Sequence, residues 1–362
     1  MRKICIVAGA RPNFVKVAPI IRAVRRAKDE GRDVDYTLIY AGREKDATLE
    51  DTLFEDLQMP RPDVYLGVDC QSLNELTGRV MGEFEQYLEQ HGADVVIVVD
   101  DLASTMAAAI VAKKRGVMLA HLVAGTRSFD MKMPKEVNRL VIDGLSDLLF
   151  TAGEGSSSIV SREGANLSQT YMVGNILLDS QRFCRDRMHR PAVADLLKLK
   201  EKAYLVFTLN RKALIADEDN LCRMVRAMSA AAGDIPIVAP LRAAARKAVE
   251  KAGGQLPNIR FIEPLSYLEF GWLTMNSMGI VTDSGNVAEE ATFNGVPCAT
   301  LNSYTEHIET VRVGSNVLVG EDAGRLSLAV TDMVDGNWKK CGIPDRWDGR
   351  SAERIVQILL QQ

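Results

Sequence analysis

Residues 117–139, VMLAHLVAGTRSFDMKMPKEVNR, pass from an apolar run directly into a cluster of charged side chains. The run 117–123 predicts a buried β-strand, because a short continuous apolar segment is typical of a strand covered on both faces. The whole stretch is therefore either a solvated surface loop after a strand or the charged mouth of a site at a strand end. The charged residues that follow the run are Arg127, Asp130, Lys132, Lys135, Glu136 and Arg139.

The segments on either side of this stretch repeat an alternation of apolar runs and amphipathic patterns. Helical patterns at 12–29, 72–90 and 103–115 separate the runs, and this alternation favours a doubly wound parallel sheet of the α/β class. The other strands predicted in the first half are 3–8, 35–40, 94–99, 148–152 and 170–174.

The pattern starts again after residue 180, so a second sheet is predicted. A chain of 362 residues also exceeds the roughly 250–300 residues at which one hydrophobic core stops growing. We therefore predict two Rossmann-like domains, residues 1–178 and 179–349. A ligand cleft is predicted between them, because such sheets bind ligands outside the carboxyl ends of their strands. The strands of the second sheet are 203–208, 235–239, 259–263, 278–282 and 297–301.

Composition and charge are those of an ordinary globular protein, with 47% hydrophobic and 25% charged residues. The formal net charge is −4 and the basic residues are scattered, so neither nucleic acid nor a membrane is predicted as a partner. The six cysteines form no CxxC pair or zinc pattern, so we predict reduced thiols, a cytoplasmic location and no metal or other cofactor. The apolar run in MRKICIVAGA is too short for a signal peptide, and no stretch approaches the ~20 residues of a membrane span.

Two strand ends in the first half carry residues suited to phosphate binding or acid–base chemistry. The segment AGARPNFVK brings Arg11 and Lys16 near the N-terminus of a predicted helix, a place that binds phosphate. The alternative is a solvated turn with two surface bases. The segment VVDDLAST ends a strand with Asp100 and Asp101, which are either functional carboxylates or N-caps of the next helix.

A third strand end, VTDSGNVAEEA at residues 281–291, leads into a helix through Asp-Ser-Gly. The amides of Ser284 and Gly285 could hold a phosphate at that helix N-terminus, and a glutamate one or two turns along could accept ribose hydroxyls. The alternative is a local cap between Ser284 and Glu289, whose spacing is close to that of a capping box without matching it.

Taken together, these motifs resemble the non-hydrolysing UDP-N-acetylglucosamine 2-epimerase family, in family order and over essentially the whole chain. The matching segments are GARPNFVK, HLVAGTRSFD with PKEVNR, VGNILLD, YLEFGWL, TDSGNVAEEA, TEHIETVRVGSN and WDGRSAERIVQIL. The resemblance implies a glycosyltransferase-B-like fold, in which two Rossmann-like domains clamp UDP and a last helix, residues 350–362, returns to the first domain. It also implies a homodimer, for which the helical patterns between residues 72 and 115 offer apolar faces.

The resemblance implies roles for matched positions of this sequence. Asp101 and Glu136 match two catalytic carboxylates of the family, and Phe270 would lie against the uracil. Glu290 would bind the ribose. The implied substrate-binding set is Arg11 and Lys16 at the phosphate and sugar, Ser284 and Gly285 at the phosphate, and Arg139, Asn210, Arg211, Phe270, Glu290 and His307.

The same resemblance includes departures at positions that carry chemistry. Val123 stands where the family has a third catalytic glutamate, and Asn210 stands where it has a phosphate-contacting histidine. Further departures are Ala41-Gly42-Arg43, Arg242, His307 and Asp100, the last of which is a carboxylate that the family pattern lacks.

These departures bear on the family's reaction, which eliminates UDP to a 2-acetamidoglucal and adds it back after protonation of the other face. Each proton transfer needs a positioned acid or base, which contributes about 10²–10⁴-fold, and valine cannot act as either. Asp100 could replace the lost group. We therefore predict an enzyme that interconverts UDP-GlcNAc and UDP-ManNAc or a related UDP-sugar, with unaltered, altered or weakened chemistry. The alternatives are a non-catalytic UDP-sugar binding protein or partner subunit, and a sugar-nucleotide hydrolase or glycosyltransferase on the same fold.

Overall fold

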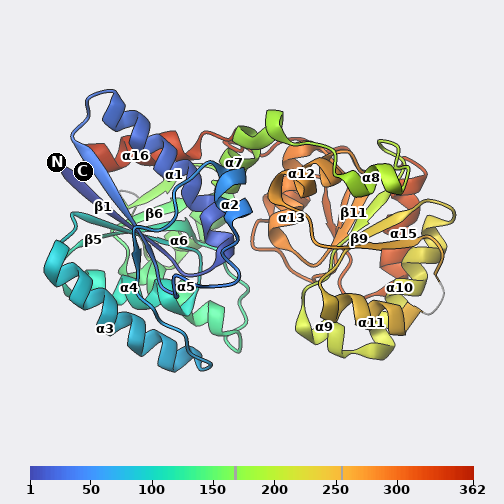
Figure 1. The fold of residues 1–362 in the computed structure, drawn as a ribbon, viewed down its shortest axis with the longest axis horizontal. Helices are drawn as coiled ribbons and strands as arrows, with labels where there is room; N and C mark the ends of the chain where they lie inside the picture. Colours follow the sequence, from blue (N-terminus) through green and yellow to red (C-terminus); the bar gives the residue numbers. More distant parts are fainter. Residues whose placement is uncertain (167–168, 254–255) are drawn as a thin grey trace. The chain divides into compact units, whose positions relative to one another are not determined.

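The computed structural model describes the whole chain except residues 167–168 and 254–255, and it divides into two compact units. The first unit is Met1–Phe183 together with Asp345–Gln362, and the second is Cys184–Pro344. Each unit contains one parallel β-sheet flanked by helices (Figure 1). The predicted fold class, α/β with two Rossmann-like sheets, is confirmed.

The sheet of the first unit has the strand order β3-β2-β1-β4-β5-β6-β7, so the direction of winding reverses between β1 and β4. Its strands are β1 (Arg2–Ala8), β2 (Val34–Tyr40), β3 (Val64–Tyr65), β4 (Val95–Val99), β5 (Met118–Ala124), β6 (Leu148–Thr151) and β7 (Thr170–Met172). Its helices are α1 (Arg11–Asp29), α2 (Asp51–Leu57), α3 (Leu73–His91), α4 (Ala103–Lys114), α5 (Pro134–Leu145), α6 (Glu154–Arg162), α7 (Leu177–Cys184) and α16 (Ser351–Gln361).

The sheet of the second unit has the order β10-β9-β8-β11-β12-β13, so its winding reverses between β8 and β11. Its strands are β8 (Leu205–Phe207), β9 (Ile237–Pro240), β10 (Ile259–Ile262), β11 (Gly279–Thr282), β12 (Cys298–Thr300) and β13 (Asn316–Leu318). Its helices are α8 (Ala192–Leu196), α9 (Lys212–Ala216), α10 (Glu218–Ala232), α11 (Ala243–Gly253), α12 (Tyr267–Met275), α13 (Gly285–Asn294), α14 (Glu309–Arg312) and α15 (Ala323–Val334).

The burial of the central strands follows from their apolar composition. All five residues of β4, VVIVV, are buried, because the strand lies between two neighbours with helices on both faces. Sequence analysis missed β3 and β13, which are edge strands of two and three residues. Helix α7 ends at Cys184 and is followed by a 3₁₀ turn, Arg185–Arg187.

The C-terminal segment packs on the first unit, where α16 lies beside α1 (Figure 1). Trp347 is fully buried and donates from its indole nitrogen to the carbonyl oxygen of Ala152 at 2.9 Å. The carboxylate of Asp179 accepts from the amides of Ser351 and Ala352 at 3.0 and 2.8 Å, which caps the start of α16. The buried helix end therefore has partners for two of its otherwise orphaned amides.

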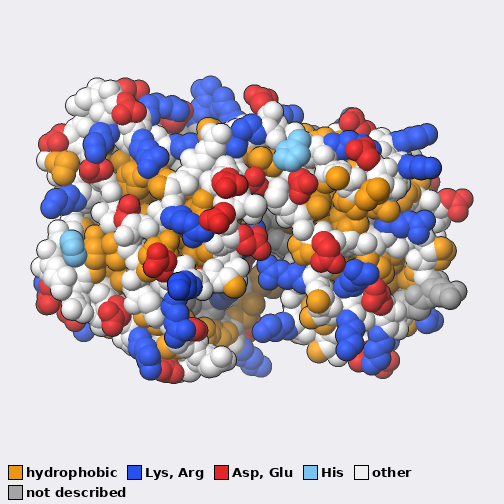
Figure 2. All heavy atoms as spheres, viewed as in Figure 1, with side chains coloured by type: hydrophobic (Ala, Val, Ile, Leu, Met, Phe, Trp, Pro, Cys, Tyr) orange, Lys and Arg blue, Asp and Glu red, His pale blue; other side chains and the backbone are white. Residues whose placement is uncertain are grey.

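Acidic and basic side chains are interspersed over both units on the face drawn in Figure 2. No helix within the described part of the chain is long and apolar enough to cross a membrane.

Candidate active site

Asp100 follows β4 at the point where the first sheet reverses its winding. Its Oδ1 lies 2.6 Å from Nζ of Lys16, and its Oδ2 accepts from Nδ2 of Asn13 at 2.8 Å. Both partners are on α1, which follows β1, and Oδ1 of Asn13 also accepts from the amides of Gly9 and Ala10. The Asp100 carboxylate therefore joins the two strand ends between which open α/β sheets usually bind their ligands.

Asp101 is buried and faces two basic side chains of α5. One carboxylate oxygen lies 2.8 and 2.6 Å from Nε and Nη2 of Arg139, and the other lies 3.2 Å from Nζ of Lys135. Burial alone would raise the pKa of Asp101, but the charges of Lys135 and Arg139 outweigh it and hold the pKa below its usual value. Asp101 is thus ionised at neutral pH.

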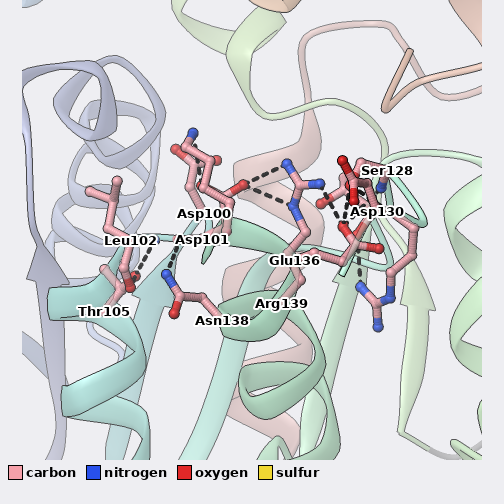
Figure 3. A network of polar contacts seen from close by, with 12 residues as sticks. Asp100, Asp101, Leu102, Thr105, Ser128, Asp130, Glu136, Asn138 and Arg139 are labelled. Atoms are coloured by element: carbon pink, nitrogen blue, oxygen red, sulfur yellow. Dashed lines mark hydrogen bonds and ion pairs between the residues drawn. The ribbon is translucent and has the colours of Figure 1, made fainter. Parts of the chain in front are cut away.

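Glu136 is the second predicted catalytic carboxylate, and Arg139 joins it to Asp101 (Figure 3). Its oxygens accept hydrogen bonds from the amide and hydroxyl of Ser128, the amide of Phe129 and Nη1 of Arg139 at 2.8–3.0 Å. Burial raises the pKa of Glu136, but these hydrogen bonds more than offset it and the net pKa is lowered. Glu136 therefore fixes the loop after β5 as an ionised acceptor.

The N-capping interpretation of Asp100 and Asp101 is wrong. The N-cap of α4 is Leu102, and its amide donates to the hydroxyl of Thr105 at 3.0 Å. The two aspartates thus carry no capping role at this helix and point to other partners.

Val123 has an unusual backbone conformation at the carboxyl end of β5. Its φ is +72°, its side chain is half-buried, and the register of β5 against β6 shifts between Leu122 and Ala124. A positive φ is a genuine outlier for a β-branched residue. The amide of Asp100, whose own φ is +58°, donates to Leu122 at 3.2 Å, so the ends of β4 and β5 adjoin here. Two residues with positive φ thus lie at neighbouring strand ends.

A buried ionic network supports this edge, and sequence analysis did not identify it. His121 lies 2.6 Å through Nδ1 from Oδ1 of Asp143 and 2.9 Å through Nε2 from the carbonyl oxygen of Asp100. Oδ2 of Asp143 lies 2.7 Å from Arg127, which also pairs with Glu163. Burial would raise the pKa of Asp143, but His121 and Arg127 together hold it below its usual value.

Both partners of the His121 ring are hydrogen-bond acceptors, a carboxylate and a carbonyl. His121 therefore links the buried carboxylate of Asp143 to the main chain of Asp100.

In the second unit, Asp283 performs a similar joining role where that sheet reverses its winding. Its Oδ2 accepts from the amides of Asn210 and Arg211 at 2.7 and 2.5 Å, so the chain after β8 is tied to the chain after β11. The guanidinium of Arg211 lies 2.8 Å from Glu321. The charge of Arg211 is thus paired at the carboxyl edge of this sheet.

Helix α13 begins at the same edge, directly after Asp283. Ser284 is its N-cap residue and Gly285 its first residue, and the Ser284 side chain makes no capping hydrogen bond. The local cap between Ser284 and Glu289 is therefore absent. The N-terminus of α13 lies beside Asn210 and Arg211, and helix N-termini bind phosphate groups in other proteins.

Two predicted residues of the second unit, Glu290 and His307, each lie near Glu289. Glu290 is buried, and its pKa is raised to about 8, first by burial and then by the neighbouring charge of Glu289. The hydroxyl of Tyr267 lies 3.4 Å from its Oε1. Nε2 of His307 lies 3.8 Å from Oε1 of Glu289, and both side chains are buried. A hydrogen-bond donor that approaches the Glu290 carboxyl would favour its ionised form and lower its raised pKa.

The structure brings some predicted residues together and leaves others apart. Lys16 joins the acidic network of the first sheet through Asp100, whereas Arg11 lies on the first turn of α1 with its guanidinium 3.8 Å from Glu50. Phe270 is on α12, half-buried against the apolar core of the second unit. Within the described residues, no group of three or more His, Cys, Asp or Glu side chains is arranged to hold a metal ion.

Two parallel-sheet units with ionisable residues at both winding reversals define a glycosyltransferase-B-like protein. In agreement, the structure resembles the outer-core lipopolysaccharide galactosyltransferase WaaB, with a TM-score of 0.60 at 11% identity over 99% of both chains, which concerns the fold alone. Residues 26–360 match the family model described as UDP-N-acetylglucosamine 2-epimerase. The chain belongs to that family, as the motifs predicted.

Named relatives align over nearly the whole chain. The UDP-N-acetylglucosamine 2-epimerase of Methanocaldococcus jannaschii is 32% identical, over 99% of this chain and 98% of its own. The UDP-2,3-diacetamido-2,3-dideoxy-D-glucuronate 2-epimerase of Pseudomonas aeruginosa is 33% identical over 99% of each. The solved structure of the Methanocaldococcus jannaschii enzyme in complex with UDP-GlcNAc and UDP has a TM-score of 0.85, over 99% of this chain and 100% of that one.

Proposed function

We propose that this protein catalyses the 2-epimerisation of a UDP-linked 2-acetamido sugar, with the interconversion of UDP-GlcNAc and UDP-ManNAc as the first candidate. The observation that carries the proposal is the ionic network around Asp101, Glu136 and Arg139 at the winding reversal of the first sheet. Family membership over the full chain supports it.

The chemistry explains why such a network is needed. The proton on C2 is not acidic, so the proposed route removes it while UDP departs from C1, and reverses the process on the other face. Groups that move protons contribute about 10²–10⁴-fold each, and donors around the leaving phosphate stabilise its charge. Ser284, Gly285 and Arg211 are the proposed phosphate contacts, and Glu290 is the proposed ribose contact.

The names of the relatives limit the range of sugars that we propose as substrates. One is named for UDP-N-acetylglucosamine and another for a UDP-2,3-diacetamido glucuronate, and both names specify epimerisation at C2. We propose that the shared part, a UDP-linked sugar with a 2-acetamido group, is what this chain requires. A homodimer with the apolar faces of α3 and α4 paired is also proposed, and light scattering at tens of micromolar tests it.

A proton NMR time course with each of the two UDP-sugars tests the proposed reaction. Epimerisation gives a new anomeric signal of the 2-epimer at the expense of the substrate. Release of free sugar and UDP would identify a hydrolase. No change, combined with binding of UDP by calorimetry, would identify a non-catalytic binding protein and overturn the proposal.

A further inference from the structure

We infer that Asp100, held by Lys16 and Asn13, transfers the C2 proton on one face of the sugar. This inference rests on the proposed function and adds a catalytic residue to it. Asp100 bridges the ends of β1 and β4, where the winding of the first sheet reverses. The crevice at such a reversal is where ligands meet an open α/β sheet.

The other carboxylates at this edge are poorly suited to the task. Glu136 accepts four hydrogen bonds, two of them from backbone amides, and its pKa is lowered. One oxygen of Asp101 is occupied by two nitrogens of Arg139, a group that does not give up its proton. A base with a lowered pKa and filled lone pairs takes a proton from carbon reluctantly.

Unlike Asp101 and Glu136, Asp100 binds no arginine within the described part of the chain. The ammonium of Lys16 lies 2.6 Å from its Oδ1, and the two side chains are only 8% and 17% exposed, lysine first. Unlike a guanidinium, an ammonium group can lose and regain a proton in proteins, so this pair can pass a proton onward. The second oxygen is oriented by Asn13, an amide that holds the carboxylate without neutralising it.

The neighbouring strand end explains why a carboxylate is useful at position 100. Val123 is the last residue but one of β5, and its apolar side chain cannot transfer a proton. Asp100 adjoins it, because its amide donates to Leu122. The proposed proton-transfer group therefore directly follows β4 in this chain.

His121 acts as a positioning residue for Asp100. Its Nε2 donates to the Asp100 carbonyl oxygen at 2.9 Å while Nδ1 is anchored by Asp143. This contact holds Asp100 at a φ of +58°, a conformation that aspartate tolerates better than most residues. A catalytic group fixed from both its main chain and its side chain is preorganised for reaction.

The proposed elimination step moves one proton and two electron pairs. Asp100 takes the C2 proton, and the electrons of the C2–H bond form the C1=C2 double bond. The bond between C1 and oxygen breaks, and its electron pair leaves with the β-phosphate of UDP. In the return step, C2 accepts a solvent-derived proton on the opposite face and UDP adds back to C1. Asp100 releases its proton to solvent through Lys16, so protons and charge balance over the cycle.

The test compares Asp100→Asn and Asp100→Gly with wild type. Both variants remove the carboxylate, and both residue types accept a positive φ, so the fold is retained in at least one. The control is Asp35→Asn, which breaks the more exposed Lys28–Asp35 pair of 2.7 Å in the same unit. The readouts are kcat and KM, deuterium incorporation at C2 in D₂O, UDP affinity by calorimetry and the melting temperature.

We expect kcat and deuterium incorporation to fall about 10²–10⁴-fold in both Asp100 variants, with KM and UDP affinity within about threefold of wild type. Adding Val123→Glu to Asp100→Asn should recover at least about tenfold, because it returns a carboxylate to the adjoining strand end. Asp35→Asn should behave as wild type.

The outcomes separate this inference from the proposed function. Wild type that exchanges C2 normally while both Asp100 variants stay within about threefold of it would overturn the role of Asp100 and leave the epimerase proposal intact. A higher KM and a lower melting temperature with an unchanged kcat would show that Asp100 only stabilises the structure of this strand end. Wild type that turns over neither UDP-sugar would overturn both.

Discussion

His121 donates a hydrogen bond from Nδ1 to Oδ1 of Asp143 over 2.6 Å, and both side chains are buried. Asp143 is also the partner of Arg127, so one buried carboxylate contacts both the His121 ring and the Arg127 guanidinium. Its pKa is lowered despite its burial, which means that the folded state is stabilised by the ionised form. This stabilisation is present above the usual aspartate pKa and is lost as the pH falls through the lowered value in the folded state.

The substitution Asp143→Asn should destabilise the protein by about 3–5 kcal/mol, because it leaves the buried charge of Arg127 without this carboxylate and removes the anchor of the His121 ring. Urea denaturation at neutral pH measures the change. Glu353→Gln is the control, since it breaks an exposed pair with Arg26 and should cost less than about 1 kcal/mol. Equal losses in the two variants would contradict the role of Asp143 as a buried ionic partner.

A second prediction concerns the conformation of Val123. Asparagine tolerates a positive φ and valine does not, so Val123→Asn should leave stability unchanged or raise it by up to about 1 kcal/mol, although it removes a half-buried apolar side chain. Thermal unfolding measures the difference. The control is Val317→Asn, which replaces a half-buried valine of β13 that has no positive φ. We expect this control to be clearly destabilised. If both substitutions cost the same, φ at Val123 stores no strain.

The sequence predicted the fold well where strands are buried on both faces, because a run such as VVIVV in β4 has no other plausible environment. Motifs also predicted Asp101 and Glu136 as catalytic, and both carboxylates bind Arg139 in the structure. The ionic network was missed for a physical reason: His121 sits inside an apolar run, and its partner lies 22 residues further along on α5. Likewise, the positive φ of Val123 follows from a shift in strand register, which no local residue pattern encodes.

A third prediction concerns stability against pH and Glu290. Its pKa is raised from 4.5 to about 8 by burial and by Glu289. Between these values the folded state holds a proton that the unfolded state has released. The free energy of unfolding should therefore fall as the pH rises through this window, by up to about 1.4 kcal/mol per pH unit from this group. Urea denaturation from about pH 5 to pH 8 measures the slope, and Glu290→Gln should flatten it. An unchanged slope in that variant would refute the assignment to Glu290.

The last prediction links the same carboxyl group to UDP. We expect UDP to bind with micromolar to sub-millimolar affinity, about −5 to −8 kcal/mol, from a few charge-assisted contacts and one stacked ring. If ribose hydroxyls donate to Glu290, they stabilise its charged form, lower its pKa in the complex and release a proton on binding. Affinity should then rise with pH up to about pH 8, where the free group becomes ionised. Calorimetry in buffers of different ionisation enthalpy measures the number of protons released on binding. Protons released by the UDP phosphate are also released with Glu290→Gln, so the value for that variant is subtracted.

The substitution Glu290→Ala should weaken the binding of UDP more than that of inorganic pyrophosphate, which has no ribose. Equal weakening of the two ligands would mean that Glu290 acts through the structure of the site and makes no contact with the ribose.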